Sequence, residues 1–275
     1  MMEDADDLAE ALTPTALTGF SVDDGPGGTF VVPGIDPDGL LEAWRAARSV
    51  VPVTGRWPVM ITAEDDILDG EDPSDFDDLD RAARKIDPWD PPWRVISDDD
   101  PLVPARDLRS HLRGFPAELV EVASTQLAMP TAEPVLERWI YDRLLADPTL
   151  AEPFQEQVDA MVGTRHWFVP TSVRLVLLPT ALPWLAPYWL HYWGTDDSTW
   201  LSAVQYQWHL QWGAELVASW GTMLQFIVSR QPEPGEQAWE LAGQLKKVGT
   251  SLQVQQWLLA LALPHTDAWF LHDRP

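Results

Sequence analysis

The sequence predicts an α+β protein, because short strand-like segments and amphipathic helices alternate irregularly along the chain. Its 275 residues suffice for one large domain or two small ones. Hydrophobic residues make up 45% and charged residues 22%, which is typical of globular rather than disordered proteins. In detail, we expect a C-terminal α/β sandwich with Trp-rich helices on a mixed sheet, preceded by an acidic α+β region.

Charge and tryptophan divide the chain near Gly163. Residues 166–275 hold eight acids and five bases, a net of −3, so the preceding residues carry −22 of the total of −25. The distribution of Trp is the reverse, because 11 of the 16 lie in this same C-terminal part. We therefore predict an acidic N-terminal region, 1–163, and a C-terminal domain, 164–275.

The N-terminal region contains several clear local signals. Asp36 followed by Pro37 is typical of a helix start, and apolar residues at helical spacing extend this helix to Ser49. Strands are expected at 29–33 and 57–62, and further helices at 74–85, 134–146 and 149–162.

The C-terminal region has denser signals. Gly221 and Thr222 fit a two-residue hairpin turn, and Gly213 is suited to end a helix in the left-handed conformation. Strands are expected at 165–169, 173–178, 215–220, 223–228 and 268–271. Helices are expected at 182–193, 198–212, 235–248 and 253–263.

Four segments of the C-terminal region carry a resemblance to a known family. They are RLVLLPTALPW, TDDSTWLSAVQYQWHLQWGAELV, MLQFIVSRQPEPGEQAWELA and the closing AWFLHD. Together with the upstream VTGRWPVMITAEDD, they resemble domain-of-unknown-function family 4253, which is bacterial and common in actinobacteria. The resemblance implies the family's fold for about the last 110 residues. It implies no mechanism, because the family has no assigned activity.

The chain departs from this family in one segment. Family members carry a Cys-Pro-Asp sequence after the penultimate helix, where this chain reads KKVGTSLQVQQW. A function that depended on that sequence would be lost or altered here.

Composition argues against several classes of function. Without Cys, the chain has no disulfide, thiolate metal site or cysteine nucleophile. Its negative charge disfavours binding to nucleic-acid phosphates. The acidic start does not resemble a signal peptide, and Pro179, Pro183 and Pro187 interrupt the most apolar stretch, so we expect a cytoplasmic protein with no membrane span.

The acidic segment after residues 57–62 is the first candidate site. Ten acids lie between Glu64 and Asp80, without the ligand spacing of a calcium loop. The leading hypothesis is a non-enzymatic intracellular binding protein, immunity-like or toxin-neutralising, that docks a basic protein partner. The residues expected to form or border this surface are Asp65, Asp66, Asp69, Glu71 and Asp72.

The same acidity has a compositional explanation. Arg outnumbers Lys by 15 to 3, and Ala, Pro and Asp are abundant, as in proteins encoded by high-GC genomes. On this alternative the acidic segment is only a solvated stretch of chain.

Aromatic residues of the C-terminal region form the second candidate site. Trp200, Val204, Trp208 and Trp212 recur at every fourth position, which places them on one helix face. We expect Val204 and Trp208 to pack against the sheet. The alternative function is small-ligand binding or enzymatic action in an aromatic cleft formed by Trp189, Trp193, Trp200, His209 and Trp212.

The histidines suggest no cofactor. His191, His209, His265 and His272 lie in the C-terminal region, but no pair has i, i+4 spacing and no HExxH motif occurs. We therefore expect no metal and no cofactor. A His–Asp acid–base pair, such as His209 with Asp197 or His272 with Asp273, stays open as an alternative. The sequence does not predict the oligomeric state.

Overall fold

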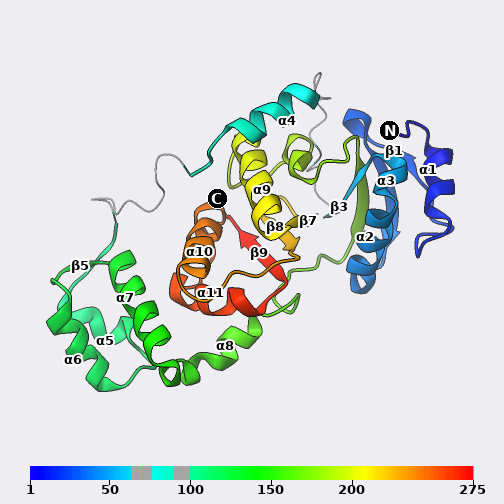
Figure 1. Ribbon diagram of the computed structural model, residues 1–275. Coiled ribbons are helices and arrows are strands. Elements are labelled where there is room, and N and C mark those ends of the chain that lie inside the picture. Colours follow the sequence, from blue (N-terminus) through cyan, green and yellow to red (C-terminus); the bar gives the residue numbers. More distant parts are fainter. Residues whose placement is uncertain (63–67, 69–75, 90–99, 275) are drawn as a thin grey trace.

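A seven-stranded mixed sheet forms the centre of the computed structural model, which describes residues 1–62, 68, 76–89 and 100–274 (Figure 1). The strand order is β1-β2-β6-β3-β7-β8-β9. Neighbouring strands run antiparallel, except for β3 and β7, which are parallel. The predicted α+β class and mixed sheet are confirmed.

The two central strands explain the most apolar stretches of sequence. β3 is buried along its whole length and β6 along nearly all of it, so both are mostly apolar rather than alternating, with Arg174 as the one charged residue of the two. The strands of the main sheet are β1 (Asp23–Asp24), β2 (Phe30–Ile35), β3 (Trp57–Thr62), β6 (Val173–Leu178), β7 (Glu215–Ser219), β8 (Met223–Ile227) and β9 (Ala268–His272). A separate pair consists of β4 (Leu102–Val103) and β5 (Thr131–Ala132).

The sheet includes strands from both sides of the boundary predicted near Gly163. β1, β2 and β3 precede that residue, whereas β6 to β9 follow it. β3 lies between β6 and β7, so the N-terminal region supplies a strand to the middle of the sheet. The regions 1–163 and 164–275 thus share one hydrogen-bonded sheet.

Helix α9 (Ser198–Trp212) contacts β8 and β9 through Trp208. Val204 and Trp208 are both 0% exposed, as predicted. The Trp208 ring meets Phe226 and Trp269 edge-on, with centroid distances of 5.8 and 5.7 Å. Gly213 ends the helix with φ 61°, in the left-handed region that the sequence indicated.

Two further helices, α2 and α10, contact the sheet. On α2 (Leu40–Ser49), the indole N–H of Trp44 donates to the Pro58 carbonyl at 2.9 Å, which fixes this helix to β3. On α10 (Glu236–Val248), Gln244 accepts from the indole N–H of Trp208 at 2.9 Å, which joins α10 to α9. The further helices around the sheet are α1 (Ala5–Leu12), α3 (Val51–Thr54), α4 (Phe76–Lys85) and α11 (Gln256–Ala262).

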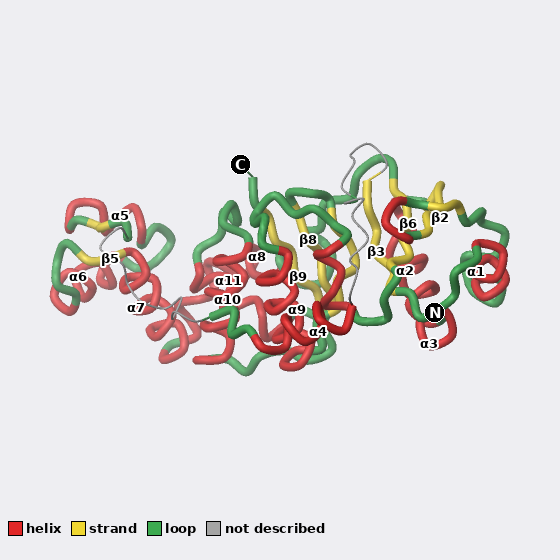
Figure 2. Tube along the Cα trace, turned by 90° about the horizontal axis from the view of Figure 1, so that it is seen from above, coloured by secondary structure: helices red, strands yellow, loops and turns green. Residues whose placement is uncertain are grey.

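A helical block projects from the sheet region. It consists of α5 (Leu108–His111), α6 (Ala117–Gln126), α7 (Glu133–Ala146) and α8 (Gln155–Ala160). The molecule is elongated, with α5 and α6 at one end, the sheet in the middle and α1 at the other end (Figure 2).

Helix α7 connects the block to α10. Arg138 forms an ion pair with Glu236 at 2.8 Å, and the Gly235 N–H donates to the Tyr141 hydroxyl at 3.0 Å. The Tyr141 ring also stacks on Trp239, with a centroid distance of 5.5 Å. These contacts hold the helical block against the C-terminal helices.

Several predicted elements differ from the structure. Residues 165–169 form no strand. The stretch at 182–193 contains only the 3₁₀ helix Pro183–Tyr188, because its prolines lack backbone donors. The helix expected at 149–162 is a 3₁₀ segment, Pro148–Phe154, followed by α8. Within the described part of the chain, no helix is long and apolar enough to cross a bilayer.

Candidate functional site

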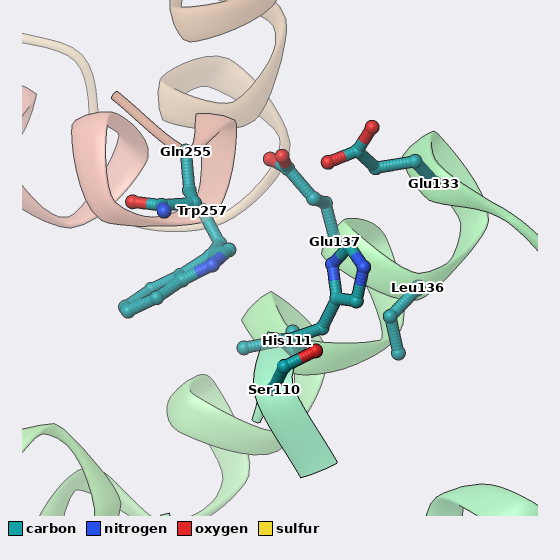
Figure 3. Close-up of a pocket in the computed structure, with 8 residues that line it drawn as sticks. Ser110, His111, Glu133, Leu136, Glu137, Gln255 and Trp257 are labelled. Atoms are coloured by element: carbon teal, nitrogen blue, oxygen red, sulfur yellow. The ribbon is translucent and has the colours of Figure 1, made fainter. Parts of the chain in front are cut away.

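A polar cleft of about 260 Å³ lies where the helical block meets the C-terminal helices. Its walls come from α5, from α7 and from the start of α11 (Figure 3). The side chains that line it are Ser110, His111, Glu133, Leu136, Glu137, Ile140, Gln255 and Trp257.

Glu137 is the buried acid of this cleft, with 8% of its surface exposed. The backbone N–H of Gln256 donates to its Oε2, and Lys246 Nζ lies 3.8 Å from its Oε1. Gln256 is the first residue of α11, and Gln255 before it makes no side-chain capping bond. The Glu137 carboxylate therefore caps the N-terminus of α11 from another helix.

The environment of Glu137 penalises its charge. Burial raises the pKa of its carboxyl group, and the nearby charge of Glu133 raises it further. Lys246 and the backbone N–H groups of α11 lower the pKa and oppose these two effects. The balance leaves the pKa of Glu137 above its ordinary value.

Glu133 lies one helical turn before Glu137 on α7. The two carboxylates lie next to each other on the same wall of the cleft (Figure 3). Glu133 is only partly buried, and no ion pair joins it to a described residue. The cleft thus holds more negative than positive charge, and a cation placed between the two carboxylates would relieve their repulsion.

Trp257 provides a rigid aromatic wall to the cleft. Its ring contacts Phe115 and Phe154, with centroid distances of 5.6 and 4.9 Å, and only 4% of the residue is exposed. An indole in this position can contact the alkyl stem or the charged head of a basic side chain. The arrangement is therefore suited to an ammonium or guanidinium group. Among the described residues, no three His, Asp or Glu side chains gather in a metal-binding arrangement.

The first predicted site lies outside the described residues. This applies to all five acids of that prediction: Asp65, Asp66, Asp69, Glu71 and Asp72. The described end of the acidic stretch belongs to α4, where Asp80 accepts hydrogen bonds from Arg84 and from the indole N–H of Trp184.

Two tryptophans of the predicted aromatic cleft are core residues. Trp189 is 0% exposed, stacks on Phe76, and donates its indole N–H to the Gly27 carbonyl at 3.2 Å. Trp212 is 5% exposed at the end of α9. Both side chains therefore pack inside the protein instead of lining an open surface.

The other three residues of that cleft lie nearer the surface. Trp193 is 57% exposed. Trp200 is half-buried and donates its indole N–H to the Pro88 carbonyl at 3.0 Å. His209 is also half-buried, and its Nδ1 lies 3.1 Å from the Ala214 carbonyl oxygen. The five residues are thus divided between core and surface.

The His–Asp pairs weighed from the sequence have other neighbours. Asp273 accepts a hydrogen bond from the Thr250 hydroxyl at 2.6 Å. Asp197 caps α9 by accepting from the Trp200 backbone N–H at 2.8 Å. Both carboxylates thus have local structural roles.

The closing part of the chain supplies four strands of the sheet, β6, β7, β8 and β9, together with helices α9, α10 and α11. Strand β3 of the N-terminal region lies between β6 and the other three. A comparison with protein families identifies this part. Residues 174–273 match DUF4253, a domain of unknown function. The resemblance inferred from the sequence is confirmed for these residues. No significant match to the chain is found among curated proteins or among solved structures.

The polar cleft lies at the border of the DUF4253 region. Lys246, Gln255 and Trp257 belong to that region, whereas Glu133 and Glu137 come from the helical block. Sequence reasoning missed this site because Glu137 and Gln256 are 119 positions apart. The one available signal was the spacing of two acids by four residues on a single helix.

Proposed function

We propose that this protein is a binding protein for a basic protein partner, and that a Lys or Arg side chain of the partner enters the polar cleft. The observation that carries the proposal is the pair of adjacent carboxylates on α7, Glu133 and Glu137, of which one is buried and the other has no described ion-pair partner. An immunity-like or toxin-neutralising role is the specific form of this function that the acidity favours.

The geometry suits a basic side chain better than a small anion or an apolar group. Glu133 supplies a charge that a cation would neutralise, and the buried Glu137 carboxylate strengthens the field at the end of the cleft. Trp257 offers an apolar wall for the stem of the entering side chain. A long Lys or Arg side chain satisfies all three features at once.

The negative net charge of the protein favours association with a basic partner, but it does not determine which face of the protein the partner binds. Helices α1 and α6 lie at opposite ends of the molecule (Figure 2). Both ends carry exposed carboxylates, for example Asp4 and Asp6 at the start of α1, and Glu118 and Glu121 on α6. Such charge accelerates association with a basic partner, and the gain falls as salt rises. Specificity therefore rests on the cleft.

The proposal is tested by titrating the protein with a fluorescently labelled decalysine peptide and measuring anisotropy. We expect Glu133→Gln to weaken binding about fivefold at low salt, because one close charge contributes about 1 kcal/mol. The matched control is Glu118→Gln, which removes the same charge from an exposed position on α6. Its affinity should stay within about twofold of the wild type.

Equal affinities for the two variants would overturn the assignment of the cleft. They would mean that decalysine is held by the general negative field of the protein. A labelled decaglutamine peptide serves as the uncharged control and should not bind. Tight binding of that peptide would contradict an electrostatic site.

A further inference from the structure

A second polar pocket, of about 250 Å³, lies beside the start of α9, and we call it the α9 pocket. It is lined by the end of the 3₁₀ helix Pro183–Tyr188, by the connection to α9 and by the first turn of α9. Polar atoms make up most of the surface that faces it. Its described lining contains one carboxylate, no Lys and no Arg, and lies wholly within the DUF4253 match.

Four polar side chains of this lining can be reached from solvent. Asp196 is exposed, and His191, Thr195 and Ser198 are half-buried. The side chains of His191, Asp196 and Ser198 form no hydrogen bond with a described residue. The Thr195 hydroxyl accepts from the Asp197 N–H at 3.0 Å, which leaves its own proton free to donate. The pocket therefore offers a ligand both donors and acceptors.

An exposed tryptophan belongs to the same connection. Trp193 is 57% exposed, more than any other tryptophan among the described residues. The Thr195 N–H donates to the Tyr192 carbonyl at 3.2 Å, and Trp193 lies in the turn that this bond closes. The Trp193 ring meets the His191 ring edge-on, with a centroid distance of 4.8 Å. An open aromatic ring thus stands next to a residue that lines the pocket.

We propose that the α9 pocket binds a neutral sugar in its pyranose form, with the Trp193 ring as a stacking platform. A sugar hydroxyl can donate to the Asp196 carboxylate and can also accept from a hydroxyl or an imidazole N–H. The C–H face of the sugar ring packs on the negative face of an indole. A cavity of about 150 Å³ holds benzene, so a pocket of about 250 Å³ admits one hexose ring.

Other classes of ligand fit the α9 pocket less well. An apolar molecule would remove its polar groups from water without replacing their hydrogen bonds. An anion would be repelled by Asp196 and would find no Lys or Arg in the described lining. A basic group would pair with one exposed carboxylate, and such a pair contributes little in water.

The α9 pocket is separate from the proposed partner site. No residue lines both it and the polar cleft between α7 and α11. Of the aromatic cleft expected from the sequence, only Trp193 takes part in the proposed sugar site. Either proposal can therefore fail without the other.

Saturation-transfer difference NMR on the full chain, at physiological salt, tests the proposal with glucose, galactose and mannose. These probes share one ring and differ in the orientation of single hydroxyls. We expect at least one of them to bind with a Kd of about 1 mM, which is ordinary for a ligand of this size. Cyclohexylammonium has a ring of the same size with one charge and no hydroxyl, and should bind at least about fivefold more weakly than that hexose.

Variants then locate the bound hexose. Trp193→Ala and Asp196→Ala should each weaken its binding at least about fivefold, because they remove the platform and the charged acceptor. The matched controls are Phe168→Ala and Asp267→Ala, which make comparable changes at exposed positions outside the pocket. Both controls should stay within about twofold of the wild type. Trp193→Phe keeps an aromatic face and should retain most of the affinity.

Three results would overturn the proposal. The first is that none of the three hexoses binds with a Kd below about 10 mM. The second is that cyclohexylammonium binds more tightly than every hexose, which would indicate a site for a cation. The third is that Trp193→Ala and Asp196→Ala bind the hexose as well as their controls do, which would place the sugar elsewhere on the protein.

Discussion

Two ionisable side chains, Glu137 and His166, are buried to different extents, and different surroundings shift their pKa values. Glu137 retains compensation for its charge from Lys246 and from the N-terminus of α11. His166 has no described charged partner, and burial alone lowers the pKa of its imidazole to about 4. The first side chain therefore joins two elements, and the second stays neutral at pH 7.

His166 predicts a pH dependence of stability. Its pKa falls from 6.5 in the unfolded chain to about 4 in the fold. The unfolded state therefore binds the proton more strongly, and the contribution of His166 is present above pH 6.5 and lost as pH falls toward 4. We expect the wild type to lose more stability than His166→Phe when the pH falls from 6.5 to 4, by about 2 kcal/mol as measured by urea unfolding. The difference is smaller than the full pKa shift would give, because solvent screens a partly exposed ring.

An exposed histidine provides the control for this experiment. His265→Phe makes the same change where the side chain is open to water. It should leave the pH dependence of unfolding unchanged. An identical pH profile for His166→Phe and the wild type would show that the imidazole is not withdrawn from water.

Truncation of Glu137, a residue of α7, is expected to destabilise a different helix, α11. Glu137→Ala removes the acceptor that caps α11 and leaves Lys246 without its partner. We expect a loss of about 2 kcal/mol in the free energy of unfolding, measured with urea. Glu137→Gln should lose less, because an amide oxygen can still accept from the helix. Glu156→Ala, on the exposed side of α8, should stay within about 0.5 kcal/mol of the wild type, and an equal loss there would refute the capping role.

Among the elements, α9 has the strongest link between sequence and packing. Its tryptophan spacing predicted a buried face, and Trp208 is fully buried against β8, β9 and α10. The helix ends at Gly213 for the reason visible in the sequence, since glycine adopts the left-handed conformation without strain.

Trp208 therefore predicts a large loss of stability on truncation. We expect Trp208→Ala to lower the free energy of unfolding by about 3–5 kcal/mol, because it empties a core site and leaves Gln244 unpaired. Trp193→Ala makes the same change at a mostly exposed position and should cost less than about 1 kcal/mol. A small loss for Trp208→Ala would mean that α9 is not seated on the sheet.

Helices and strands that a local sequence pattern marks could be predicted, whereas those without such a pattern could not. The Asp36–Pro37 start and the apolar run at β3 mark their elements directly. Helices α1 and α6 went unpredicted, as did the coil at 165–169, where Trp167 donates its indole N–H to the Trp269 carbonyl. That hydrogen bond joins residues 102 positions apart, so no local pattern reveals it.

At the scale of the whole molecule, composition suggested a division that the sheet does not follow. Charge and tryptophan change near Gly163, but β3 pairs with β6 and β7 across that point. Strand order depends on pairing between distant segments, which neither composition nor periodicity encodes. The polar cleft was missed for the same reason.

The shared sheet predicts that residues 164–275 do not fold alone. In that fragment β6 would lose both of its neighbours, β2 and β3, and its apolar faces would be exposed. We expect no cooperative urea transition and no native near-ultraviolet circular dichroism from the fragment, compared with the full chain. A fragment with both properties would show that the C-terminal half is an autonomous domain.

The central claim is that a basic partner inserts a side chain between the helical block and α11. Hydrogen exchange of the full chain, with and without decalysine, tests it most directly because it locates the bound peptide without any substitution. We predict added protection in α5, in the first turns of α7 and at residues 255–257. Protection confined to residues 64–80, or spread evenly over the acidic surface, would contradict the assignment of the cleft.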